Sequence, residues 1–214
     1  MNMDIVNYLS NIYGYDTPIF LKDVRIGRKS KSAIREEFYR ATKEGRLTRE
    51  KNGIYYLKSN KEFGNVITFE EILDSKFIHS DCAPGFEQLF VSGYYSGLSF
   101  VNQIGISQQV PAILEVTSNN TSSKKRYFVV GKRVAVIRKS RTEITFQNYK
   151  MLQFLDMFHF VTMNEVKRYR KLIREYIQNN HLSKYQFQQY IKFYGTDTIK
   201  KIVEGGIIDA FVEW

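Results

Sequence analysis

Turn and cap residues divide the segment from residue 30 to residue 57 in a way that leaves it few possible folds. Ser30 or Ser32 is suited to cap the start of a helix, and Gly45 stands where a glycine commonly ends one. Asn52-Gly53 then separates two short apolar runs, a pattern typical of a β-hairpin with positive φ at both central residues. The sequence therefore predicts a helix followed by a two-stranded hairpin.

A shorter helix is expected just before this one. Thr17 can cap a helix and Pro18 suits the first helical position, so we expect a helix that runs through Val24. An apolar stripe in residues 4–13 predicts another helix at the start. Helix, turn, second helix and hairpin follow each other in this order in winged helix-turn-helix domains. We therefore expect residues 1–59 to form a winged helix-turn-helix domain that binds DNA.

The stretch from Lys22 to Lys51 also carries more than half of the excess charge. Eleven basic and five acidic side chains lie between Lys22 and Lys51, a net +6 of the formal total of +10. Charge concentrated in this way suits a phosphate backbone, although a solvated helix face is the alternative. Four side chains on the exposed helix face are expected to contact bases or sugars, and three basic ones to contact phosphates. The first group is Lys31, Ser32, Arg35 and Tyr39, and the second is Lys29, Arg49 and Lys51.

A second domain is expected over residues 66–214, after a polar linker at 58–64. β-branched and aromatic runs predict a three-stranded antiparallel meander within about residues 110–140. The three runs are 112–116, 126–130 and 133–138. The predicted fold class of the whole chain is therefore α+β, with a small antiparallel sheet and a helical C-terminal part.

Helices are expected on both sides of the meander, over residues 92–104 and from about 145 to 205. Thr68 is suited to cap a short helix of its own. Thr162 and Glu165 form a capping-box pattern that opens a helix expected to continue to Ile177.

The predicted meander carries a second basic zone. Eight cations and no acid lie between Lys124 and Arg141, and such a run repels itself unless an anionic partner is present. A second nucleic-acid surface and a solvated face both remain open. The residues assigned to the possible surface are Lys124, Lys125, Arg126, Lys132, Arg133 and Arg138.

Residues suited to catalysis are sparse. The three histidines match no metal-ligand spacing. A metal-dependent nuclease would need acidic residues and a nearby lysine; Asp81 and Glu115 are the best candidates, but Thr117 occupies the lysine position. We therefore predict no catalytic residue, no metal and no cofactor, and keep the nuclease as an alternative.

Composition restricts the cellular setting. With 43% hydrophobic and 15% aromatic residues in 214, the chain can bury a substantial core, and a pI near 9.5 favours an anionic partner. Neither a membrane-spanning run nor a signal peptide is expected. A single cysteine, Cys82, fits a reducing cytoplasm.

Residues 96–111 resemble a motif of the AbiEi antitoxins of bacterial abortive-infection systems. In that family a small-residue helix start and an asparagine precede Leu-Gly-Leu-Thr-Thr-Gln-Val-Pro. Residues 104–111 of this chain read Ile-Gly-Ile-Ser-Gln-Gln-Val-Pro. The hairpin segment and residues 115–119 and 152–156 also resemble family landmarks, so the similarity covers roughly residues 3–160.

The resemblance implies an antitoxin of a type IV toxin-antitoxin system. Such a protein counteracts a nucleotidyltransferase-like toxin without a stable complex, and it represses its own operon by binding promoter DNA through the winged domain. A plain DNA-binding regulator without a toxin is a further alternative.

Overall fold

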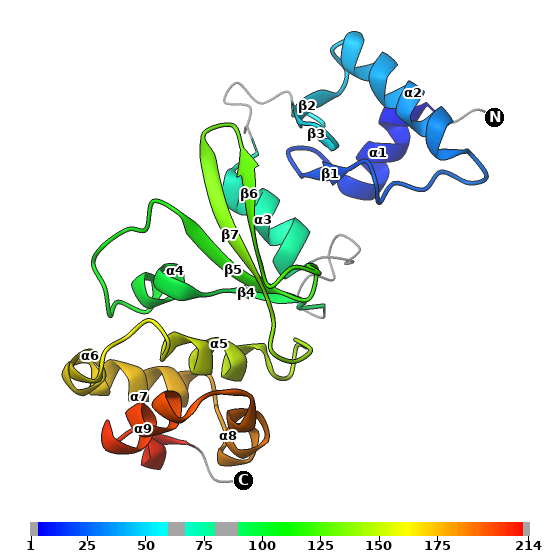
Figure 1. Cartoon of the computed structure of the whole chain (residues 1–214). Helices are drawn as coiled ribbons and strands as arrows, with labels where there is room; N and C mark the ends of the chain where they lie inside the picture. The colour runs from blue at the N-terminus through cyan, green and yellow to red at the C-terminus, as the bar shows by residue number, and fades with distance from the viewer. Residues whose placement is uncertain (1–3, 60–66, 80–89, 212–214) are drawn as a thin grey trace.

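The computed structural model describes residues 4–59, 67–79 and 90–211 (Figure 1). The chain is α+β, with one three-stranded antiparallel sheet and one four-stranded mixed sheet in these ranges. No helix among the described residues is both long enough and apolar enough to cross a membrane.

The N-terminal segment, residues 4–59, folds around two helices and the three-stranded sheet. Leu9 of the first helix and Phe38 of the second are fully buried in the same cluster, and the Phe38 ring meets Tyr55 edge-on with centroids 4.9 Å apart. The sheet order is β1-β3-β2. In chain order the elements are α1 (Ile5–Tyr13), β1 (Ile19–Phe20), α2 (Lys31–Lys43), β2 (Thr48–Lys51) and β3 (Ile54–Tyr56).

The prediction of a helix from Pro18 through Val24 is wrong. Ile19 and Phe20 form β1 instead and pair antiparallel with β3. Both side chains are buried. Because successive side chains of a strand point to opposite faces of the sheet, both faces of this sheet must be covered at β1. A turn follows at residues 21–23, so α2 lacks the preceding helix that a helix-turn-helix requires.

The predicted second helix and hairpin both form, with two changes in detail. Ser30, not Ser32, caps α2, since its hydroxyl accepts a hydrogen bond of 3.2 Å from the amide of Ala33. In the hairpin turn only Gly53 has positive φ (81°), so the expectation for Asn52 is wrong. The pairing of β2 with β3 shifts between Arg49 and Lys51, and this bulge changes the turn geometry.

The second sheet has the strand order β4-β5-β7-β6. The predicted meander is wrong in its pairing, because β5 pairs parallel with β7 while β6 and β7 form an antiparallel hairpin. This arrangement puts β5 and β7, each with three successive buried residues, in the centre and leaves β6, where four of the six residues are exposed, at the edge. The strands are β4 (Gly93–Tyr95), β5 (Leu114–Ser118), β6 (Lys125–Val130) and β7 (Arg133–Lys139).

The helix predicted over residues 92–104 is shorter than expected. Gly93 begins strand β4, where its backbone lies so close to the carbonyl oxygen of Phe77 that a Cβ would stand 2.1 Å from it. The helix, α4 (Gly97–Gln103), starts only after the strand, and Gly105 ends it with φ 80° as predicted.

Helices cover the two faces of this sheet (Figure 1). On one face lie α3 (Phe69–Leu73) and the π-helical segment η1 (Asp74–Ile78), and on the other lie α4 and α5 (Tyr149–Met157). Phe20, Ile54 and Tyr56 of the N-terminal segment belong to the same buried cluster as the α3 side of the sheet. The N-terminal segment therefore packs against this face.

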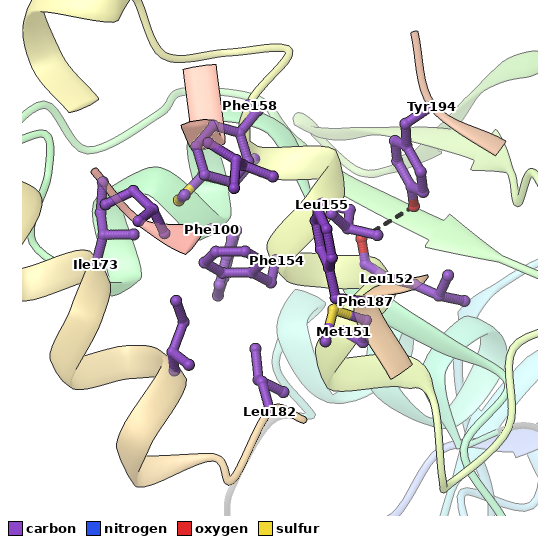
Figure 2. Packing of buried hydrophobic residues seen from close by; sticks show 14 of the residues in the cluster. Phe100, Met151, Leu152, Phe154, Leu155, Phe158, Ile173, Leu182, Phe187 and Tyr194 are labelled. Carbon is purple, nitrogen blue, oxygen red and sulfur yellow. Dashed lines mark hydrogen bonds between the residues drawn. The ribbon is translucent and has the colours of Figure 1, made fainter. Parts of the chain in front are cut away.

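The C-terminal helices build the largest core, which Figure 2 shows around Phe154. The Phe154 ring stacks on Tyr176 and meets Phe158 edge-on, while the Tyr194 hydroxyl donates to the carbonyl of Leu152 at 3.2 Å. The helices after α5 are α6 (Met163–Arg168), α7 (Arg170–Asn179), α8 (Lys184–Tyr190) and α9 (Thr196–Glu204), with 3₁₀ turns η3 (Ile191–Phe193) and η4 (Ile208–Ala210).

The predicted capping box of Thr162 and Glu165 is confirmed, and Thr68, predicted as a cap, forms a capping box with Glu71 at the start of α3. The single helix expected to reach Ile177 is divided, however. At Tyr169 the backbone (φ −100°, ψ 18°) leaves the helical region, so α6 ends and α7 begins.

Candidate nucleic-acid interface

The exposed face of α2 presents the four side chains predicted to contact bases or sugars. Lys31, Ser32 and Arg35 are exposed, and 61% of Tyr39 is open to solvent. The opposite face, with Ile34, Phe38 and Ala41, is buried. Within the described residues, none of the four exposed side chains has an ion pair or a side-chain hydrogen bond. The helix therefore offers an unneutralised polar face of the width that a major groove accepts.

Lys29, predicted to contact phosphate, is differently placed. Its ammonium group lies 2.5 Å from a carboxylate oxygen of Glu37, and both side chains are largely buried. The pair neutralises Lys29 and holds the loop before α2 against the helix. Lys29 is therefore better suited to position α2 than to bind phosphate.

The two cations of the hairpin also have partners. The guanidinium of Arg49 donates to the side-chain carbonyl of Asn52 at 2.7 Å, which leaves its charge intact and exposed at the turn. Lys51 points the other way. Its ammonium group donates to the carbonyl of Val129 and lies 5.1 Å from the centroid of the Phe128 ring, so it faces the β6–β7 hairpin.

The second basic zone is divided by the sheet that carries it. Lys125 and Arg138 are partners across β6 and β7 and so share one face, whereas Arg126 lies on the other. Arg126 donates to the carbonyl of Asn120 at 3.1 Å and lies over the Phe77 ring. The run that is continuous in sequence is thus not one continuous surface.

Two further members of this zone are already paired with acids. Arg138 lies 2.8 Å from a carboxylate oxygen of Glu115, and Arg133 contacts the carboxylate of Glu70. Both acids lie outside residues 124–141. The sequence of the zone therefore did not reveal that two of its cations are neutralised. Arg141 likewise pairs with Asp156 at 3.6 Å. The cations of the zone that have no ion pair within the described residues are Lys124, Lys125, Arg126, Lys132 and Lys139.

The residues considered for a nuclease are not assembled into a metal site in the described part of the chain. Glu115 is engaged by Arg138, and Thr117 is buried with its hydroxyl 2.9 Å from that of Ser96. Asp81 lies outside the described residues. Among those residues, no group of three potential metal ligands occurs.

The structure adds two cations that the sequence did not single out for binding. Lys22 and Lys76 line the same pocket as Lys31, Arg35 and Lys51. Lys76 follows Asp74 and Ser75 in η1, and no sequence signal brings it next to α2. Burial lowers the pKa of Lys76 to about 8, helped by the neighbouring charge of Lys22.

Comparison of the chain with protein-family models found no match, and comparison with curated proteins found none either.

Proposed function

We propose that this protein binds double-stranded DNA through the exposed face of α2 and regulates transcription from its own promoter. The observation that carries the proposal is the set of uncompensated polar side chains on α2. Lys31 and Arg35 have no ion pair within the described residues, and Tyr39 stands beside them as an exposed aromatic side chain. Arginine reads guanine in the major groove through two parallel hydrogen bonds, and lysine supplies phosphate or guanine contacts.

The hairpin after α2 supports the same proposal. It forms where the sequence predicts a wing, and Arg49 next to its turn is exposed and has no ion pair within the described residues, so it can approach a phosphate. The preceding helix of a helix-turn-helix is replaced here by β1 and a turn. Contacts with the DNA phosphate backbone must therefore come from other groups. Lys22, Arg25 and Arg28, in the loop between β1 and α2, are exposed and can take this part.

We further propose that the protein is an antitoxin of a type IV abortive-infection system, which counteracts a nucleotidyltransferase-like toxin without a stable complex. This part rests on the resemblance of residues 96–111 and on the segments that accompany it. In the fold these residues are the N-cap residue Ser96, helix α4 and the loop that follows it. Val110 is 83% exposed in that loop, so the motif is accessible to a partner.

Two experiments test the proposal. Fluorescence-anisotropy titration of the full chain should give tighter binding to the duplex upstream of its own gene than to a scrambled duplex, and both affinities should fall steeply with salt. Equal affinity for the two duplexes would argue against a promoter-specific regulator. Co-expression with the nucleotidyltransferase gene expected beside it should restore growth, and failure to do so would remove the antitoxin assignment alone.

A further inference from the structure

The N-terminal segment, η1 and the second sheet line a half-open pocket of about 520 Å³. Its walls come from β1, from the first turns of α2, from the hairpin turn, from η1 and from β6. The volume is in the range of sites for small molecules and cofactors. A duplex is convex and has no free base to insert, so a concave space of this kind suits a small ligand better than the DNA itself.

Five cations line this pocket. Among its described lining residues none is acidic, and only Lys22 has a carboxylate within ion-pairing range, that of Asp23 at 3.7 Å. Such a concentration of positive charge without counter-charge favours a ligand with several negative charges. The five are Lys22, Lys31, Arg35, Lys51 and Lys76.

The floor of the pocket is apolar and partly aromatic. Phe20 and Phe128 line it together with Ile34 and Ile54. The ammonium group of Lys76 lies 4.5 Å from the centroid of the Phe20 ring and 5.7 Å from that of Phe128, so the rings and the charge border the same space. A ligand that fits must present a flat or apolar group beside its anionic group.

We propose that this pocket binds a phosphorylated small molecule with an aromatic group, of the nucleoside diphosphate class, with its phosphates at Lys76, Lys51 and Arg35 and its base against Phe20 and Phe128. The assignment rests on the volume of the half-open pocket, on the uncompensated cations and on the aromatic wall. It does not require that the chain binds DNA.

A regulatory consequence follows where the proposed function also holds. Lys31, Arg35 and Lys51 line the pocket and are also predicted DNA contacts. A side chain that binds a phosphate of the nucleotide cannot make its full contact with DNA at the same time. A bound nucleotide should therefore weaken the complex with DNA. Linkage makes the effect reciprocal, so DNA should weaken nucleotide binding by the same factor.

Isothermal titration calorimetry of the full chain with ADP, in the absence of DNA, tests the proposal. We expect one ADP per chain, and at least tenfold weaker binding for Lys76→Met, which keeps the apolar stem and removes the charge. Lys200→Met is the matched control, because Lys200 is an exposed residue of α9 and lies outside the pocket lining. This variant should bind ADP within twofold of wild type. Adenosine and pyrophosphate, titrated separately, should each bind at least tenfold more weakly than ADP.

Three results would overturn the inference: no heat of binding with ADP, equal affinity of the two lysine variants, or pyrophosphate binding as tightly as ADP. If ADP does not bind and Lys76→Met weakens DNA binding instead, the pocket belongs to the DNA surface. Because calorimetry is done without DNA, loss of this inference leaves the proposed function untouched. Conversely, a chain that binds ADP but no duplex would retain the pocket and lose the proposed function.

Discussion

The ammonium group of Lys76 in η1 lies 4.5 Å from the centroid of the Phe20 ring in β1. The contact joins the N-terminal segment to the part of the chain that carries the second sheet, and it does so with a partly buried charge. Lys76 has no ion pair within the described residues, and Phe20 belongs to the cluster formed by both parts. A cation–π contact offsets only part of the cost of removing an ammonium group from water.

Lys76→Met should therefore stabilise the fold at neutral pH. The pKa of Lys76 is about 8 in the folded chain, below its usual 10.5, so the unfolded chain binds more protons between these values. Stability of the wild type should then rise as pH increases through this window. Allowing for the exposed part of the side chain, Lys76→Met should gain about 1 kcal/mol at pH 7. Urea unfolding at pH 7 and pH 10.5 measures this gain, which should vanish at the higher pH; a destabilised variant at pH 7 would contradict it.

Gly93→Ala tests the close approach of β4 to η1. A Cβ at residue 93 would stand 2.1 Å from the carbonyl oxygen of Phe77, and backbone atoms cannot move aside as a flexible side chain can. We expect a loss of about 2 to 3 kcal/mol. Gly131→Ala is the control, because Gly131 has positive φ but open space around it and should lose only about 1 kcal/mol. Thermal unfolding of both variants compares them, and an equal loss would refute the steric explanation.

Asp156 should tolerate loss of its charge but not loss of its hydrogen-bonding oxygen. The Tyr94 hydroxyl donates to this carboxylate at 2.8 Å in the interior, and burial raises the pKa of Asp156 above its usual 3.8. The folded state thus keeps the proton to higher pH than the unfolded state, so the contribution of Asp156 to stability falls as pH rises from about 3.8 through the folded-state pKa.

The free energy of unfolding of Asp156→Asn should accordingly stay within about 1 kcal/mol of the wild-type value at pH 7. It should also fall less than that of the wild type as the pH rises above 4. Asp156→Ala should cost about 2 to 4 kcal/mol, because it removes the carboxylate to which the buried Tyr94 hydroxyl donates and opens a cavity. Urea unfolding between pH 4 and pH 7 distinguishes the two. If the asparagine variant is as unstable as the alanine variant, the charge itself is needed, through Arg141 at 3.6 Å.

Elements specified by nearby residues could be predicted from the sequence. Helix α2 depends on Ser30 and Gly45 at its ends, and the capping boxes at Thr68 and Thr162 are local hydrogen bonds. The hairpin of β2 and β3 depends on Gly53. The exposed face of α2 follows from helical spacing in the same way, so the exposure of its candidate residues could be predicted.

Elements specified by distant partners were missed. Ile19 and Phe20 are a strand because β3 pairs with them across 34 or more residues, and the parallel pairing of β5 with β7 depends on β6 lying at the edge. Lys76 meets Phe20 only after the two parts of the chain have packed together. Likewise Glu70 and Glu115 neutralise Arg133 and Arg138 only in the folded state. The sequence therefore overestimated the unpaired positive charge of the second basic zone.

DNA binding by the exposed face of α2 is tested most directly by two arginines on the same helix. Arg35 lies on the unneutralised face, whereas Arg40 is turned away from it and pairs with Glu36 at 3.5 Å. Anisotropy titration with the upstream duplex should give a loss of about 1 to 3 kcal/mol for Arg35→Ala, with reduced discrimination against scrambled DNA. Arg40→Ala should stay within about twofold of wild type. Unchanged promoter affinity for Arg35→Ala, or equal losses for the two variants, would contradict the account.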